Sequence, residues 1–336
     1  MTDATLGSLL GSAPPQMAQA DLAALVAQHY GLRGPLRALT SERDLNLHLA
    51  TPEQGYVIKL ANPAEPAEVT DFQTRALLHL QAAGLPVPRL IRSRDGQTQV
   101  PTPQGILRVL TYLEGIPQHL TPQSDAQAAD LARMAARLAL GLQGFSHPAA
   151  DYVLQWDLKQ AAALQPLLPA IADPALRDLA AATLARYHVD IAPALPDLRW
   201  QVVHNDLNPH NVLCAPDAPD RIAGVLDFGD MVRTPLICDV AIAAAYQLDP
   251  RAPLHSLTNF ARAYHAVLPL TATERALLPD LAATRMLTTI AITSARAARY
   301  PDNAAYILRN FAAARAGLIA LAGLERSSVL KELEQL

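Results

Sequence analysis

Acid and amide side chains recur at fixed spacing within residues 201–246. Asp206 is followed five residues later by Asn211, and an apolar run, Ile222 to Leu226, ends in Asp227-Phe228-Gly229. Transfer of a phosphoryl group needs one carboxylate facing the acceptor hydroxyl and a separate pair of oxygen ligands for Mg²⁺. Asp206 suits the first task, as catalytic base, and Asn211 with Asp227 suits the second. The stretch therefore predicts phosphoryl transfer.

Short β-like runs flank these side chains. Val202-Val203 precedes them, and the turn-rich segment 215–220 predicts that Val212 to Cys214 folds back on residues 222–226 as a hairpin. In such a hairpin Asn211 and Asp227 lie beside each other. One amide and one carboxylate are then enough for Mg²⁺, because it completes its octahedron with phosphate and water.

Each of these residues also has an ordinary explanation when taken alone. Asp206 and Asn211 could be turn residues, and an isolated D-F-G occurs by chance. A zinc site is open on ligand type, although no C-x-x-C or H-E-x-x-H pattern supports it; its ligands would be His204, Asp206, His210 and Cys214. Order, spacing and flanking strands together favour the catalytic interpretation. His204 is expected to be a structural hydrogen-bonding residue.

The H-x-D-x-x-x-x-N and D-F-G pattern is typical of kinases. The stretch resembles the aminoglycoside phosphotransferase and choline kinase superfamily, small-molecule kinases related to protein kinases, and residues 227–246 resemble most the hydroxylysine kinase group. The resemblance implies Asp206 as catalytic base, Asn211 and Asp227 as metal ligands, and Asp239 as a buried acid that ties down the catalytic loop. From its position alone, Asp239 could instead cap a helix over residues 240–246.

Composition describes an ordinary globular chain. It has 336 residues, 51% of them hydrophobic, and a formal net charge of −4. The absence of a lysine- or arginine-rich run argues against nucleic acid or an anionic membrane as a partner. Cys214 and Cys238 make no disulfide framework, which suits a reducing cytoplasm. No export signal and no bilayer-spanning run are visible, so the expected location is cytoplasmic.

The first third of the chain predicts a helix at 18–30 and a hairpin of strands 36–39 and 45–49. In the family that this chain resembles, the hairpin loop covers the nucleotide phosphates. Here the loop contains no glycine, so backbone N–H groups, helped by Ser41 and Arg43, would have to hold the phosphates. An ordinary polar turn is the alternative.

Lys59 lies inside an apolar strand at 56–60. A lysine in such a strand needs an anion, and nucleotide phosphates would supply one, so Lys59 is the predicted nucleotide lysine. A helix at 67–83 should carry its acidic partner. The usual glutamate falls at Gln73, which leaves the partner open between Glu68 and Asp71.

Strands are also expected at 85–94 and 106–112, followed by a hinge at 110–114. Thr111 and Leu113 would present backbone groups to the purine there. Because such recognition uses backbone atoms, the sequence does not distinguish ATP from GTP.

After Gly115 the composition changes to helical segments rich in alanine and leucine, at 125–142, 158–186, 256–267, 273–299 and 303–321. We therefore expect two domains, 1–115 for nucleotide binding and 116–336 for catalysis and substrate binding. The predicted fold is α+β and bilobal, protein-kinase-like, with a small mixed β-sheet lobe and a mostly helical lobe.

Two features concern the acceptor. Arg285, Thr289, Arg296 and Arg299 fall within about a 90° arc of one helix, which is either a carboxylate-binding stripe or a solvated face. Asp230, directly after the D-F-G, is favoured over Asp302 to hold a substrate ammonium. Asp230 and Arg285 are therefore the candidate substrate residues.

The sequence thus predicts a kinase that transfers the γ-phosphoryl group of ATP or GTP, with Mg²⁺, to a hydroxyl of a small amino-containing molecule. A hydroxylysine-like hydroxy amino acid is the favoured acceptor. An aminoglycoside O-phosphotransferase and a homoserine kinase are the alternatives within the enzyme class. A nucleotide-binding pseudokinase is the alternative outside it, and intact Asp206, Asn211 and Asp227 argue against it.

Overall fold

A computed structural model describes residues 14–41 and 43–336. The chain divides into two compact units. The first runs to Gly115 and also takes in residues 147–150 and 224–226, and the second holds the remainder. Two short segments from the later part of the chain therefore belong to the first unit, which the continuous boundaries expected from the sequence did not include.

The first unit is built on a six-stranded sheet of order β1-β2-β3-β6-β4, with β5 paired to β6. The α+β class is confirmed, with one difference: the pairings within this sheet are antiparallel, where the sequence predicted a mixed sheet. Its strands are β1 (Leu36–Leu39), β2 (Leu45–Ala50), β3 (Gly55–Leu60), β4 (Leu90–Ile91), β5 (Val100–Thr102) and β6 (Gly105–Thr111).

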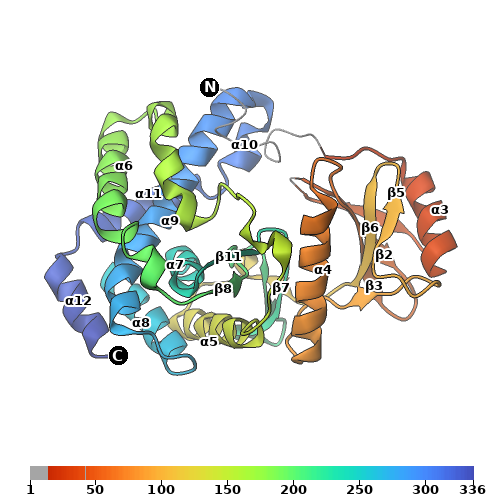
Figure 1. Cartoon of the computed structure of the whole chain (residues 1–336), viewed down its shortest axis with the longest axis horizontal. Coiled ribbons are helices and arrows are strands. Elements are labelled where there is room, and N and C mark those ends of the chain that lie inside the picture. Colours follow the sequence, from red (N-terminus) through yellow and green to blue (C-terminus); the bar gives the residue numbers. More distant parts are fainter. Residues whose placement is uncertain (1–13, 42) are drawn as a thin grey trace. The chain divides into compact units, whose positions relative to one another are not determined.

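Two helices cover opposite faces of this sheet, α3 (Gln19–Tyr30) and α4 (Ala67–Ala82), as Figure 1 shows. Alternate strand residues such as Leu47, Ile58 and Val109 form one core with Leu22 and Val26 of α3. The residues between them face α4, because side chains alternate along a strand. Strand β3 thereby carries Lys59 on the α4 face.

The weakest part of the predicted sheet was the strand at 85–94. Only Leu90–Ile91 pairs as a strand, because Pro86 and Pro88 have no N–H to donate to a ladder. Strand β5 was not predicted.

The second unit is mostly helical. Helix α7, which follows the D-F-G segment, is almost entirely buried and packs against α9. The helices are α5 (Asp125–Gly141), α6 (Pro174–Arg186), α7 (Leu236–Tyr246), α8 (Pro253–His265), α9 (Ala272–Arg299), α10 (Ala304–Ile307), α11 (Phe311–Ala322) and α12 (Arg326–Glu334).

Two segments predicted as single helices are broken. Residues 158–186 form a 3-10 run, Leu158–Ala170, and then α6, because Pro166 and Pro169 cannot donate the hydrogen bonds of an α-helix. Residues 303–321 separate into α10 and α11. Helix α12 was not predicted.

Two small sheets hold the predicted catalytic stretch. Strand β8 (Trp200–Val203) pairs with β11 (Val232–Pro235), and β9 (Val212–Ala215) lies between β7 (Ile116–Pro117) and β10 (Ala218–Val225). The hairpin predicted after Asn211 is therefore present, although its turn is shorter than residues 215–220.

Within the described ranges, no single helix is long and apolar enough to cross a membrane. The adjoining segments Pro301–Ile307 and Phe311–Ala322 are long and apolar enough only when taken together, and the chain bends by 55° between them.

Helix α9 begins with a capping box. Thr271 accepts a hydrogen bond from the Glu274 N–H, and Glu274 accepts one from the Thr271 N–H. The Glu274 carboxylate also accepts two hydrogen bonds from Arg199, at 2.8 and 2.5 Å, and the residue is 1% exposed. One side chain thus joins the start of α9 to the residue preceding β8.

We expect Glu274→Ala to lower the free energy of unfolding by about 2 kcal/mol, because the helix loses its cap and Arg199 its acceptor. Urea denaturation followed by circular dichroism measures this loss. Glu334→Ala, at the exposed end of α12, is the control, with an expected change within about 0.5 kcal/mol. Equal stability of both variants would contradict the role given to Glu274.

Candidate active site

The predicted catalytic loop, residues 204–211, is fixed by a buried acid. Asn205 has a left-handed backbone, φ 65°, and its N–H donates to the Asp239 carboxylate at 2.7 Å. Burial raises the pKa of Asp239, and His204 and the Asn205 N–H lower it. Asp239 lies in the first turn of α7, which begins at Leu236, so it does not cap that helix as one interpretation of the sequence had it.

His204 completes the support of the loop. It is fully buried, its Nδ1 accepts a hydrogen bond from the Asp206 N–H at 3.2 Å, and its ring meets that of Phe228 edge to face at 4.8 Å. These contacts fit the structural role expected of His204.

Three side chains donate to the carboxylate of Asp206. Oδ2 accepts from Asn208 and from Asn211, each at 2.8 Å, and Oδ1 accepts from Arg285 at 3.0 Å. A carboxylate has about four lone-pair positions. Both positions on Oδ2 are taken and one on Oδ1 is left, which fixes the atom that could accept a further proton.

Burial and the neighbouring charges shift the pKa of Asp206 in opposite directions. Burial raises the pKa of Asp206 to about 6, Arg285 lowers it, and Asp230 and Asp227 raise it. The carboxylate is therefore a stronger base than an exposed aspartate and still ionised at neutral pH.

Asn211 and Asp227 have geometry that fits a cation. The Asn211 amide nitrogen donates both to the side chain and to the carbonyl of Asp206, so the amide oxygen is left for a metal. Asp227 is exposed and has a left-handed backbone, φ 55°, which is uncommon for aspartate. Its negative charge reaches Asp206, and a divalent cation would relieve this repulsion.

The zinc alternative has no support in the geometry. In the part of the chain that the structure describes, no group of three or more His, Cys, Asp or Glu side chains could hold a metal ion. Cys214 instead contacts Thr121 and Gln127.

The prediction that Arg285 binds a substrate carboxylate needs correction. Arg285 is 3% exposed and its guanidinium contacts Asp206, the Tyr246 hydroxyl and the Trp156 carbonyl. Thr289 and Arg296, from the same stripe, are buried as well, which excludes a solvated face at those positions. Asp230 is half-buried and acts electrostatically on both Asp206 and Arg285.

In the first unit, Lys59 forms an ion pair with Asp44, at 3.2 Å, a residue that the sequence reasoning did not consider. Asp71 instead contacts Arg75 and His147, and Glu68 is exposed. Gln73, at the usual glutamate position, accepts a hydrogen bond from Arg108, which lies directly across the ladder from Lys59.

Asp44 also organises the predicted phosphate loop. Its N–H donates to the Ser41 hydroxyl at 3.2 Å, and its carboxylate accepts from the Asn62 N–H at 3.1 Å. Asn62 in turn donates to the carbonyl of Arg43. The loop is thereby tied to β3 without a glycine-rich turn.

The two predicted hinge residues differ in what they can offer a purine. Thr111 is buried, and both its N–H and its hydroxyl are hydrogen-bonded to the backbone of Arg89. A backbone hydrogen bond from Thr111 to a purine would therefore have to use its carbonyl. Leu113 follows the end of β6 and is half-buried.

Several residues near Asp206 were missed. Asn208 lies inside the H-x-D-x-x-x-x-N motif, where its amide could have been recognised from the sequence. Nothing in the sequence around Tyr246 or Trp156 indicated a place near Asp206. Burial, the neighbouring His119 and then Arg309 lower the pKa of His210 in the predicted catalytic loop to about 4, and Asn310 raises it through a side-chain hydrogen bond. Arg309 is exposed on the connection between α10 and α11, directly before this Asn310.

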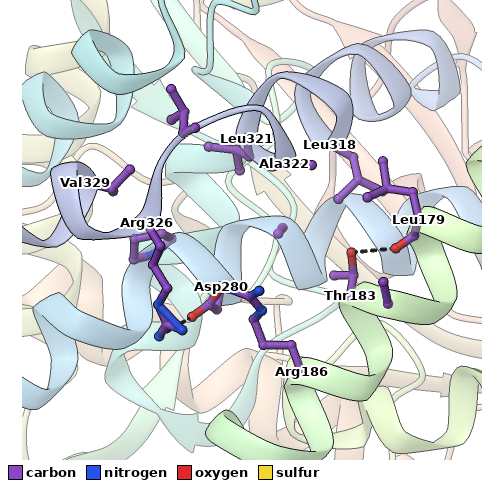
Figure 2. A pocket seen from close by; sticks show the side chains of 13 residues that line it. Leu179, Thr183, Arg186, Asp280, Leu318, Leu321, Ala322, Arg326 and Val329 are labelled. Carbon is purple, nitrogen blue, oxygen red and sulfur yellow. Dashed lines mark hydrogen bonds and ion pairs between the residues drawn. The ribbon is translucent and has the colours of Figure 1, made fainter.

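A separate cavity of about 300 Å³ lies among α6, α9, α11 and α12 (Figure 2). Its one acid, Asp280, pairs with both of its arginines, with Arg186 at 3.4 Å and with Arg326 at 2.8 Å. It contains none of the predicted site residues.

Comparison with known proteins shows the family to which the chain belongs. The model of the phosphotransferase enzyme family matches residues 36–279. Hydroxylysine kinase of Mus musculus is 26% identical over 327 residues, covering 88% of this chain and 87% of the relative. Homoserine kinase of Methylocella silvestris is 29% identical over 280 residues, covering 80% and 82%.

Among solved structures, the amicoumacin kinase hAmiN in complex with AMP-PNP, Ca²⁺ and Ami matches with a TM-score of 0.69 at 12% identity. The match covers 93% of this chain and 97% of that one. The predicted kinase-like fold is thus confirmed.

We expect Asp239→Ala to speed hydrogen exchange at the Asn205 amide about 10-fold or more, because this buried N–H loses its acceptor at a cost of about 1–3 kcal/mol. Exchange followed by mass spectrometry, on a peptide that spans the catalytic loop, measures it. Asp217→Ala, at an exposed turn position, is the matched control. Unchanged protection in Asp239→Ala would show that the carboxylate does not hold the loop.

Proposed function

The chain belongs to the phosphotransferase enzyme family and is a small-molecule kinase acting on a hydroxyl group, and we propose that its acceptor is a hydroxy amino acid such as 5-hydroxylysine. The observation that carries the mechanism is the carboxylate of Asp206, on which three donors leave one lone pair of Oδ1. That lone pair accepts the hydrogen of the substrate hydroxyl.

Asp206 then acts as general base. The substrate oxygen forms a bond to the γ-phosphorus, the bond from that phosphorus to the β-phosphate oxygen breaks, and the hydroxyl proton passes to Asp206 Oδ1. The products are a phosphorylated substrate and a nucleoside diphosphate. A nucleoside triphosphate as donor is supported by the solved relative that contains AMP-PNP.

The Asn211 amide oxygen and the Asp227 carboxylate would hold Mg²⁺. When bound, the ion neutralises charge on the transferred phosphoryl group. With two protein oxygens the site relies on phosphate and water for the remaining ligands, as is usual for Mg²⁺.

For the nucleotide we propose Lys59 as the phosphate-binding lysine, positioned by Asp44 from the loop that includes Ser41 and Arg43. Asp44 takes the task that a helix glutamate has in protein kinases, since Gln73 is occupied by Arg108. For the purine we propose the Thr111 carbonyl and the backbone of Leu113. ATP and GTP both fit such recognition.

For the acceptor we propose Asp230 as the partner of the ammonium. Arg309 replaces Arg285 as the candidate for the carboxylate, because Arg309 is exposed and lies near the catalytic loop, whereas Arg285 is buried. The pairing of one acid with one arginine suits an amino acid. A site for a polycationic aminoglycoside would need several acidic side chains and no arginine.

The pH dependence of turnover tests the base. Burial raises the pKa of Asp206 to about 6, and only the ionised form accepts a proton. We therefore expect kcat/KM to rise with pH through about 6 and to level off above it. Rate measurements from pH 4.5 to 8.5 check this, and full activity at pH 4.5 would contradict it.

Release of nucleoside diphosphate over a panel of acceptors tests the substrate class. The panel holds 5-hydroxylysine, homoserine, a simple amino alcohol and an aminoglycoside. Highest kcat/KM with 5-hydroxylysine is expected. Homoserine remains the second candidate, because it carries the same groups on a shorter chain and a homoserine kinase is among the relatives. Turnover of the aminoglycoside alone would refute the proposal.

We expect Arg309→Ala to raise KM for the acceptor about 10-fold, with little change in kcat, because a charge-assisted hydrogen bond of the bound substrate is lost. Arg315→Ala is the matched control, since Arg315 is also exposed and pairs with Asp173. Steady-state kinetics compare the two variants. If Arg309→Ala and Arg315→Ala gave the same KM, the carboxylate would bind elsewhere.

A further inference from the structure

Arg285 occupies an unusual position for an arginine. It lies in the middle of α9, is 3% exposed, and its Nε is buried with no hydrogen-bond partner. A buried cation is costly unless it is paired and hydrogen-bonded. The contacts of its guanidinium therefore have to offset that cost.

Two aromatic rings hold the guanidinium. Its central carbon is 5.4 Å from the ring centroid of Trp156 and 5.4 Å from that of Tyr246, which is within the range of cation–π attraction. The Tyr246 hydroxyl and the Trp156 carbonyl accept its hydrogen bonds at 3.0 and 3.2 Å. The group is thus fixed before any substrate binds.

The remaining contact of this fixed group is with Asp206 Oδ1 at 3.0 Å. Oδ1 is the oxygen that keeps a lone pair, because both positions on Oδ2 are taken by Asn208 and Asn211. Arg285 therefore determines which direction on the carboxylate is open to a hydroxyl.

From this geometry we propose that Arg285 is the positioning residue of the base: it holds Asp206 Oδ1 so that the open lone pair points in one defined direction. The inference rests on the proposed function, in which Asp206 is the base. Arg285 acts through Asp206 and does not bind the substrate carboxylate.

The electrostatic surroundings agree with this role. The acids near Asp206 come from two elements, Asp227 and Asp230 from the D-F-G segment and Asp239 from α7. His204 lies in the same loop and Tyr246 adjoins Arg285. Arg285 is the charged group among these that lowers the pKa of Asp206, against burial and the two acids of the D-F-G segment.

The test compares Arg285→Gln with Arg275→Gln, a control on the same helix whose arginine donates to the Leu270 carbonyl. In Arg285→Gln we expect kcat to fall about 10- to 100-fold, while KM for the nucleotide and KM for the acceptor stay unchanged. Arg275→Gln should keep the wild-type kcat.

Arg285→Lys and chemical rescue cover the case in which Arg285→Gln folds poorly by circular dichroism. Lysine restores the charge with a single donor group, so its kcat should lie between those of wild type and Arg285→Gln. Guanidinium ion added to Arg285→Ala at millimolar concentration should raise kcat. A wild-type kcat in both Gln and Lys variants, or no rescue of the folded Ala variant, would overturn the proposal.

Asp206→Asn separates this proposal from the function on which it rests. If Asp206→Asn is inactive and Arg285→Gln keeps the wild-type kcat, the base stands and the role of Arg285 is wrong. If Asp206→Asn retains full activity, the proposed base itself is wrong.

Discussion

The arrangement of the site depends on how the Asp206 carboxylate is satisfied. Asn208 and Asn211 both donate to Oδ2, and Arg285 donates to one lone pair of Oδ1. This partly buried acid therefore keeps one defined direction, the second lone pair of Oδ1, in which it can accept a proton. Without these donors the carboxylate would be both free to rotate and harder to ionise, because burial disfavours its charged form. The same hydrogen bonds turn the Asn211 oxygen outward, so one set of contacts prepares both the base and a metal ligand.

Much of the second unit serves to hold these donors in place. Strand β8 ends directly before His204. Asp239 of the buried helix α7 accepts a hydrogen bond from the N–H of Asn205, whose backbone is left-handed. Arg285 lies on α9. The capping box of α9 and its link to Arg199 set where that helix starts. Arg285 is about three turns further along, so the position of the guanidinium depends on that start.

The catalytic stretch could be predicted from sequence because its residues are local. Asp206, Asn211 and Asp227 lie within 22 positions, and the β-turn-β pattern between them is visible without tertiary information. Arg285 is 79 residues from Asp206, and an arginine stripe on a helix looks the same whether it faces water or an acid. That is why its burial was not foreseen. Asp44 was missed for a related reason: the sequence reasoning looked for the partner of Lys59 on α4 and not in the neighbouring loop.

One helix was predicted with wrong boundaries because the prolines in its sequence were given too little weight. Pro166 and Pro169 stood inside the predicted helix 158–186 and convert its first half to a 3-10 run. Burial, by contrast, cannot be read from an apolar period alone. Helix α7 is buried along most of its length and begins at Leu236, whereas the sequence indicated a helix only over residues 240–246.

Turnover by Asp206→Asn tests the central claim most directly. With the acceptor that the wild-type enzyme phosphorylates best, kcat should fall about 100-fold or more, because the general base is lost, while calorimetry should find nucleotide affinity largely unchanged. Wild-type turnover in a folded Asp206→Asn enzyme would contradict the account, because the carboxylate around which the site is built would then have no part in the reaction.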